Sequence, residues 1–428
     1  MASLPSAETA KAAPIIQTVE TTRIRVPLAR TYHGSSYRMA FRSTILTRVH
    51  TSTGTIGEAY VGDEDAGLAE IDEIIHTEIA PRLLGTDSRR IERSWENAYL
   101  PTRDILRDRR LGLVASAAVD TAIWDAIGKQ HGEPLWRLWG GYRDRLPMVA
   151  IGGYYGTELE PQIENILALG VAGLKLKVGG ASPEQDAERF ALARRIVGPD
   201  FMLGADANQA WTTHQAIRFA RTASEHRIDW FEEPCLWAND RLAMRDVRMV
   251  AGVKVTAGQS EHSAAGCRDL MAAGAIDVCN FDASWSGGPT EWRRVAAIAR
   301  AYDVEMGHHE EPQVASHLLA AIPHAVFVEC FDPDRDPIWW NLVANRPKLE
   351  RGVLRLPDAP GFGWEFDLDF IAKYRIEQPR TTGRGGDPPE QIDDRLETLD
   401  CDRRAIWSAR PAVPIAFDAD DNDVPSSE

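Results

Sequence analysis

The chain has 428 residues, of which 44% are hydrophobic and 26% charged, a composition typical of a globular protein with an ample core. Its formal net charge of -16 argues against a nucleic acid or an anionic membrane as partner. The five cysteines are scattered without a Cys-x-x-Cys spacing, which indicates a reducing compartment rather than a disulfide framework. Neither a secretory signal nor an apolar run of roughly 20 residues is recognisable, so we expect a cytoplasmic protein that does not span a membrane.

The N-terminal part of the chain predicts an α+β domain over residues 15–145, after a disordered tail at residues 1–14. Runs rich in β-branched residues at 24–26 and 43–49 predict strands, and we expect the polar segment 29–38 between them to be a loop. Apolar residues then recur at helical spacing over 66–84 and 111–128.

Strands and helices alternate in the next part of the chain, residues 146–345. Short apolar runs recur roughly every 20–30 residues, with amphipathic stretches such as 183–197 and 214–225 between them. This pattern predicts an α/β fold with a (β/α)8-type barrel. A doubly wound open sheet is the alternative, although no Gly-x-Gly-x-x-Gly follows an early strand. The expected strands are 148–151, 173–178, 201–203, 229–231, 253–255, 276–278, 304–306 and 325–328.

The end of the chain contains two further segments. Residues 346–376 are expected to return to the first domain, and residues 377–428 to form a polar, partly disordered extension.

Two lysines, Lys175 and Lys177, share one face of an otherwise apolar strand. A buried parallel strand is usually apolar on both faces, so the pair taken alone favours an exposed edge strand with solvated lysines. The alternative is a buried base whose pKa is lowered by its neighbour.

Polar residues stand at the C-terminal ends of nearly all the expected barrel strands, where barrel enzymes carry their chemistry. Close carboxylates repel one another unless a cation joins them, and oxygen ligands suit Mg²⁺. Any one acid could simply cap a helix, but the joint pattern favours a site. Besides the lysines, it comprises Asp206, Asn208, Glu232, Gln259, Glu261, Asp282, His309 and Glu329.

These motifs resemble those of the enolase superfamily, mandelate racemase subgroup, over roughly residues 15–370. One position departs from the family pattern. The family usually has Gly-Glu at the fifth strand, where this chain has Gly258-Gln259. The matching segments are Lys175-Leu-Lys177, Asp206-Ala-Asn208, Trp230-Phe-Glu-Glu-Pro234, Asn280-Phe-Asp282, His309 and Phe327-Val-Glu329.

The resemblance implies a barrel covered by a capping domain, and a Mg²⁺ ion bound by Asp206, Glu232 and a third ligand. We expect Glu261 to be that ligand, with Gln259 beside it or replacing it. Relatives tend to be dimers or octamers, so we expect a homo-oligomer.

The resemblance also implies roles in catalysis. Lys177 is expected to be the base on one face of a carboxylate substrate, with Lys175 lowering its pKa. His309, oriented by Asp282, is expected to be the acid or base on the other face. Glu329 is expected to bind the substrate or orient the lysines.

Acid-sugar dehydration through an enediolate is the expected reaction, because it is common among relatives with these groups. Tyr32, His33, Tyr37 and Arg38 on the polar segment, with Asn208 and Gln259, are expected to contact a polyhydroxylated substrate. Arg38 or Arg42 could pair with a second carboxylate, which favours a galactarate-like diacid. The alternatives are a racemase, epimerase or cycloisomerase, a non-catalytic sugar-acid binder, and a Schiff-base lyase using Lys177.

Overall fold

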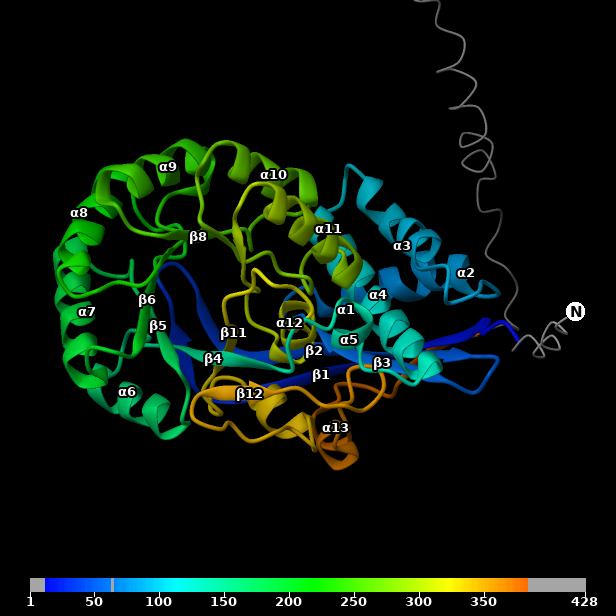
Figure 1. Cartoon of the computed structure of the whole chain (residues 1–428). Helices are drawn as coiled ribbons and strands as arrows, with labels where there is room; N and C mark the ends of the chain where they lie inside the picture. The colour runs from blue at the N-terminus through cyan, green and yellow to red at the C-terminus, as the bar shows by residue number, and fades with distance from the viewer. Residues whose placement is uncertain (1–11, 63–64, 384–428) are drawn as a thin grey trace, which may run out of the picture. The chain divides into compact units, whose positions relative to one another are not determined.

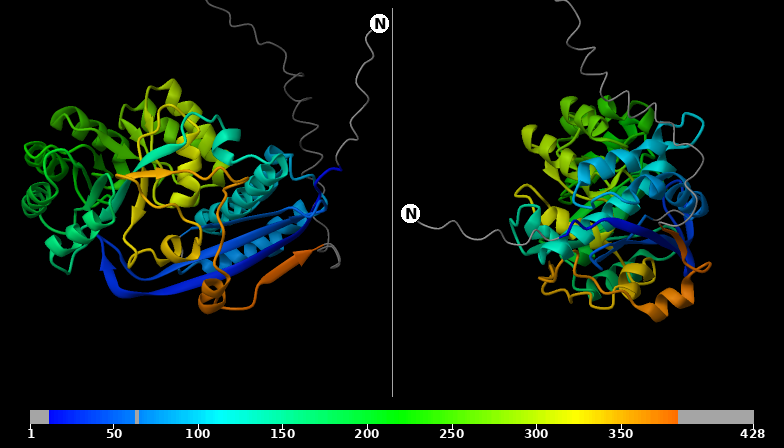
Figure 2. Two further views of the ribbon diagram at one scale, coloured as in Figure 1. Left: turned by 60° about the horizontal axis from the view of Figure 1, so that its bottom comes forward. Right: turned by 90° about the vertical axis from the view of Figure 1, so that its right-hand side faces the viewer.

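An antiparallel sheet forms the first part of the fold, as the β-branched runs predict. The computed structural model describes residues 12–62 and 65–383. Strands β1 (Ile16–His33), β2 (Arg38–Thr51) and β3 (Ile56–Val61) pair in order, and β13 (Arg380–Gly383) pairs with β1 (Figure 2). The predicted loop at 29–38 is wrong for most of its length. Strands β1 and β2 continue towards each other until only residues 34–37 remain as the turn.

Helices cover this sheet, as the apolar spacing predicts. The segment predicted at 66–84 is one helical run made of α1 (Leu68–Ile74), the π-turn η1 (Ile75–Ile79) and α2 (Ala80–Leu83). It is followed by α3 (Ile91–Tyr99), η2 (Leu100–Arg103), α4 (Arg109–His131) and α5 (Leu135–Leu138). Helix α4 is long and apolar enough to cross a membrane, but 94% of its most apolar window is buried inside the protein. It packs on β2 and β3 as a core helix.

Eight parallel strands form a closed barrel, which confirms the predicted (β/α)8-type architecture and excludes the open sheet. Strand β4 pairs with both β5 and β11, and a parallel bridge between Met306 and Ala325 joins β10 to the segment just before β11. The strands are β4 (Arg145–Gly152), β5 (Gly173–Lys177), β6 (Met202–Asp206), β7 (Phe231–Glu232), β8 (Val255–Ala257), β9 (Val278–Cys279), β10 (Glu305–Met306) and β11 (Val328–Phe331).

A helix connects each barrel strand to the next, and Figure 1 shows α6 to α10 as an arc outside the strands. Ser182 and Thr212 begin α7 and α8 with reciprocal capping boxes, which explains why both helices begin where the sequence predicts. The helices are α6 (Leu159–Ala168), α7 (Pro183–Val197), α8 (Thr213–Ser224), α9 (Asp240–Ala251, preceded by η3, Trp237–Asn239), α10 (Ala264–Ala272), α11 (Gly288–Ala301) and α12 (Pro312–Ala320).

The chain after β11 contacts both sheets. It forms the π-turn η4 (Ile338–Leu342), and then β12 (Val353–Arg355), which pairs with barrel strand β4. Helix α13 (Leu368–Tyr374) then lies against β1. The domain limits at residues 145 and 346 stay predictions. The predicted terminal tails, 1–14 and 377–428, fall mostly outside the described residues.

Polar contacts join the antiparallel part to the barrel. At the hairpin tip, the backbone of His33 forms a β-bridge with that of Tyr155, which follows β4. Arg42 of β2 is buried and pairs with Glu311 at 2.7 Å and Asp336 at 3.0 Å. These contacts hold the hairpin over the carboxyl ends of the barrel strands.

Candidate active site

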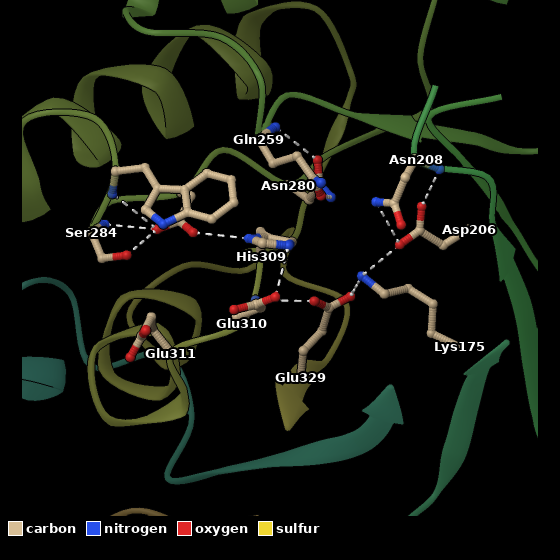
Figure 3. A network of polar contacts seen from close by, with 12 residues as sticks. Lys175, Asp206, Asn208, Gln259, Asn280, Ser284, His309, Glu310, Glu311 and Glu329 are labelled. Atoms are coloured by element: carbon tan, nitrogen blue, oxygen red, sulfur yellow. Dashed lines mark hydrogen bonds and ion pairs between the residues drawn. The ribbon is translucent and has the colours of Figure 1, made fainter. Parts of the chain in front are cut away.

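The two lysines of β5 are buried among carboxylates, so the solvated edge-strand interpretation is wrong. The ammonium of Lys175 lies 2.6 Å from Glu232 Oε1 and 2.5 Å from Glu329 Oε1. That of Lys177 lies 2.6 Å from Asp206 Oδ2 and 3.0 Å from Asn208 Oδ1. The carboxyl ends of β5, β6, β7 and β11 therefore meet in one network, of which Figure 3 labels Lys175, Asp206, Asn208 and Glu329.

Carboxylates determine the charge of these lysines. Burial disfavours both ammonium groups, but the neighbouring carboxylates outweigh burial and raise the pKa of Lys175 and of Lys177. The expected like-charge repulsion between the two lysines has the predicted direction, since Lys177 lowers the pKa of Lys175. It is outweighed, and the net pKa of Lys177 is raised because Lys177 contacts Asp206 directly.

Asp206 and Glu232 are fully buried side by side on β6 and β7. Burial raises the pKa of Glu232 to about 8, the charge of Lys175 opposes this shift, and those of Asp206 and Glu329 add to it. Glu232 Oε2 is buried without a hydrogen-bond partner, which is costly for a carboxylate and suits a further cation.

Among residues 12–62 and 65–383, no three His, Cys, Asp or Glu side chains lie close enough together to hold a metal ion, and the lysines contact the carboxylates instead. Lys175 lies against both Glu232 and Glu329, and Lys177 lies against Asp206.

The position of Glu261 does not fit the predicted third metal ligand. Its Oε1 lies 2.8 Å from Arg241 on α9, and the side chain is partly exposed. The prediction assumed strand alternation through residue 261, but β8 ends at Ala257 and the chain then turns, with Glu261 N donating to Gly258 O.

Gln259 is the buried polar residue at this strand end. Its Oε1 accepts from Asn280 Nδ2 at 3.0 Å, and its Nε2 donates to Glu233 Oε2 at 3.2 Å. Glu233, which the sequence analysis did not single out, also accepts from Gln209 and Ser260. Its only sequence signal is the acidic pair after the fourth strand.

His309 and Asp282 lie across the ring from the lysines, since β9 and β10 are distant from β5 in the strand order. His309 Nδ1 is 2.9 Å from Asp282 Oδ2, and Asp282 Oδ1 accepts two hydrogen bonds from Ser284, both 2.7 Å long. Burial opposes the charge of Asp282, but these contacts outweigh it and lower the pKa of the carboxyl. The predicted His309–Asp282 pair is present.

A second carboxylate faces the other nitrogen of this imidazole. Glu310 Oε1 lies 3.2 Å from His309 Nε2, and Glu310 N donates to Glu329 Oε2 at 3.0 Å (Figure 3). Glu310 is not among the predicted site residues, because an acidic residue beside a histidine is not distinctive in a sequence.

The predicted substrate-binding residues of the hairpin are placed differently from one another. The Tyr37 ring centroid is 5.7 Å from Lys177 Nζ, whereas His33 and Arg38 are exposed. Tyr32 is buried in a small apolar cluster beneath the tip. Arg42 is held by Glu311 and Asp336, so the idea that it receives a distal carboxylate is wrong, and Arg38 remains the candidate.

Tyr154, just after β4, is a further residue that the sequence analysis missed. Its ring meets that of Tyr32 edge to face at 5.1 Å. Its hydroxyl is buried without a hydrogen-bond partner, and the charges of Arg335, Lys177 and Glu310 act on it. A phenol in such surroundings can donate to a bound oxygen atom.

Comparison with known proteins gives concordant matches. Residues 16–140 match the family described as mandelate racemase / muconate lactonizing enzyme, N-terminal domain, and residues 158–370 match the enolase C-terminal domain-like family. A solved mandelate racemase/muconate lactonizing enzyme from a marine actinobacterium, in complex with magnesium, is 56% identical. The structural match covers 85% of this chain and 100% of the solved chain, with a TM-score of 0.81.

Two curated proteins show lower similarity. The 3,6-anhydro-alpha-L-galactonate cycloisomerase of Streptomyces coelicolor is 28% identical and covers 85% of this chain and 100% of that protein. The L-talarate/galactarate dehydratase of Salmonella typhimurium is 28% identical and covers 67% of this chain and 71% of that protein.

Proposed function

Because the chain belongs to the mandelate racemase subgroup of the enolase superfamily, we propose that it is a Mg²⁺-dependent hydro-lyase that dehydrates an acid sugar. The product is a 2-keto-3-deoxy acid. The observation that carries this proposal is the placement of proton-transferring groups on two sides of one buried site. Lys177 lies on one side, and His309 with Asp282 lies on the other.

In this reaction Lys177 Nζ takes the α-proton in its neutral form, which requires Asp206 to release its contact with the ammonium. His309 Nε2 protonates the departing β-hydroxyl. Asp282 holds Nδ1, which fixes the ring so that Nε2 faces the substrate. Lys175 and Glu329, 2.5 Å apart, hold each other in position beside the substrate carboxylate.

The residues present fit a magnesium ion. Asp206 and Glu232 would be ligands, and the buried Glu232 Oε2 that lacks a hydrogen bond supports this role. In place of Glu261, we propose the amide oxygen of Gln259 as the third protein ligand, since an amide oxygen has a second lone pair besides the one used by Asn280. When bound, Mg²⁺ supplies positive charge that stabilises the enediolate formed on loss of the α-proton.

A galactarate-like diacid is the preferred substrate. Tyr37 and Tyr154 supply hydroxyl groups near Lys177, and exposed Arg38 at the hairpin tip can reach a distal carboxylate. The Salmonella relative is named for diacids of this kind. A cytoplasmic location and a homo-oligomer stay predictions.

Cycloisomerisation is the second candidate, favoured by the Streptomyces relative. The two reactions differ in whether water is released, because opening a ring by β-elimination of its own oxygen also leaves an enol that becomes a keto group. The test incubates the protein with Mg²⁺ and a panel of aldarates, aldonates and their lactones, traps keto products with semicarbazide, and follows α-proton exchange in D₂O by NMR. A keto product that has lost one water by mass spectrometry supports dehydration, whereas a keto product of unchanged mass supports a cycloisomerase. Exchange of the α-proton without a keto product supports a racemase or epimerase.

Two variants provide controls for this test. Lys177→Ala and His309→Asn remove one proton-transferring group each, so we expect each to abolish product formation while the circular dichroism spectrum is kept. An acid sugar that binds but neither reacts nor exchanges its α-proton would indicate a non-catalytic binder. Borohydride trapping of substrate on Lys177 would instead indicate a Schiff-base lyase.

A further inference from the structure

The imidazole of His309 is bracketed by two carboxylates. Asp282 Oδ2 lies 2.9 Å from Nδ1, and Glu310 Oε1 lies 3.2 Å from Nε2 (Figure 3). All three side chains are buried. The nitrogen that must reach the substrate therefore already has an internal acceptor.

The backbone of Glu310 is held in a strained conformation. Its φ of +50° lies in the left-handed region, as does that of Glu311 at +46°. A non-glycine residue held there is strained, and such residues cluster at functional sites. The Glu310 amide donates to Glu329 Oε2, which fixes the turn directly over the lysine network.

The groups around this pair favour a positive imidazole and a negative Glu310. Burial disfavours the imidazolium, but Glu310 and Asp282 outweigh it and raise the pKa of His309 well above its ordinary value. Burial likewise disfavours the Glu310 carboxylate, but His309 outweighs it and lowers the pKa of Glu310. The other groups that face the pair are Glu233 after β7, Trp285 after β9, His308 of the same loop, Arg335 after β11, Arg42 of β2 and Tyr154 after β4.

The position of the protons decides what His309 can do. Asp282 accepts from Nδ1–H, so a neutral ring keeps its proton on Nδ1 and leaves Nε2 bare, able to act only as a base. Only the doubly protonated ring has a proton on Nε2 to give. A hydrogen-bond acceptor that faces Nε2 stabilises this doubly protonated ring.

We propose that Glu310 is a positioning residue that keeps His309 doubly protonated until the substrate displaces it from Nε2, so that His309 acts as an acid. This inference rests on the proposed dehydration. In that reaction the α-proton moves to Lys177 Nζ, and the Nε2 proton of His309 moves to the β-hydroxyl oxygen. The Cβ–O bond breaks and water leaves. The resulting enol loses its hydroxyl proton and gains one at C3, so protons balance once Lys177 returns its proton and His309 regains one.

Glu310→Gln tests this role because glutamine keeps an oxygen of the same reach but has no charge. The protein with ¹⁵N-labelled histidines is titrated by NMR without substrate, and His309→Asn identifies the His309 signals. We expect Glu310→Gln to lower the pKa of His309 by ~1 or more, as for the loss of an opposite charge in contact. The matched control is Glu311→Gln, since Glu311 is also buried at positive φ but contacts Arg42 and Gln313 instead. It should leave the His309 titration unchanged.

Activity gives the second readout. With a dehydrated acid sugar, the alkaline limb of kcat/KM should move to lower pH in Glu310→Gln by the shift seen in the NMR titration. If the variant does not fold, Glu310→Asp replaces it, with a smaller shift in the same direction. An unchanged His309 titration overturns the inference even if dehydration is found. A shifted titration without dehydration of any acid sugar supports the Glu310–His309 pairing and refutes the proposed function instead.

Discussion

Asp120 of α4 offers a sharp test of the electrostatics of the fold. Its carboxylate accepts from Thr290 N at 3.0 Å and from Thr290 Oγ1 at 2.8 Å, at the N-terminus of α11. Burial raises its pKa from 3.8 to about 7, although the hydrogen bonds of Thr290 oppose the shift. The folded protein therefore binds a proton here that the unfolded chain has already lost between about pH 4 and pH 7.

The sign of the effect follows from this order. As pH rises through that range, the free energy of unfolding falls by about 1.4 kcal/mol per pH unit on account of Asp120. From pH 5 to pH 8 this amounts to up to about 3 kcal/mol. Because the N-terminus of α11 favours a carboxylate, we expect about 2 kcal/mol.

Asp120→Asn removes the titration. Its amide oxygen can still accept from Thr290 N, and its NH2 group can donate to Thr290 Oγ1 in place of the bond that the hydroxyl donated. The variant should therefore be more stable than the natural protein, and by about 2 kcal/mol more at pH 8 than at pH 5. Urea unfolding of both proteins at the two pH values measures this difference. Asp120→Ala is the control, because it leaves the Thr290 groups without an acceptor and should be less stable than Asp120→Asn at both pH values. A stability difference between Asp120→Asn and the natural protein that is the same at pH 5 and pH 8 would show that Asp120 ionises normally in the folded state.

Four further substitutions, one of them a control, test other parts of the structure. Arg42→Met leaves two buried carboxylates without their partner and should lower the free energy of unfolding by about 3–5 kcal/mol, measured by urea denaturation; a loss below ~1 kcal/mol would contradict this. Tyr154→Phe removes a hydroxyl with no protein partner, so the thermal midpoint should not fall, while KM for the acid sugar should rise; an unchanged KM would remove Tyr154 from the substrate site. Glu232→Gln should weaken Mg²⁺ binding ~10-fold or more by calorimetry, whereas Glu261→Gln should not; equal weakening would restore Glu261 as a ligand.

The barrel could be predicted from the sequence because parallel strands buried on both faces appear as short apolar runs. Each observed barrel strand begins close to a predicted one. The hairpin was less predictable. Its tip is polar because it lies over the candidate site. Polar composition predicts a loop there, although the strands continue through it.

The part of the candidate site that lies on the barrel strands could be predicted from the sequence. Lys177, Asp206 and Glu232 lie on strands, and their side chains follow the alternation of the sheet. Residues beyond the strands were not predictable in this way. Gln259 and Glu261 follow the end of β8, where a turn rather than alternation directs each side chain.

Backbone conformation explains the remaining misses. Glu233 and Glu310 have positive φ. The presence of a glutamate in a sequence does not predict this backbone conformation. The unpartnered hydroxyl of Tyr154 is a property of its surroundings and has no counterpart in the residue pattern.

The Arg42 contact has a consequence for recombination between relatives. Arg42 lies on β2, but its partners Glu311 and Asp336 lie beyond β10 and β11, more than 250 positions later in the chain. A chimaera that takes its N-terminal segment from one relative and its barrel from another separates these three residues. Where the donor lacks an arginine here, two buried carboxylates lose their counter-ion. A chimaera that folds must therefore take positions 42, 311 and 336 from the same parent. The N-terminal segment and the barrel are thus not independent units for recombination.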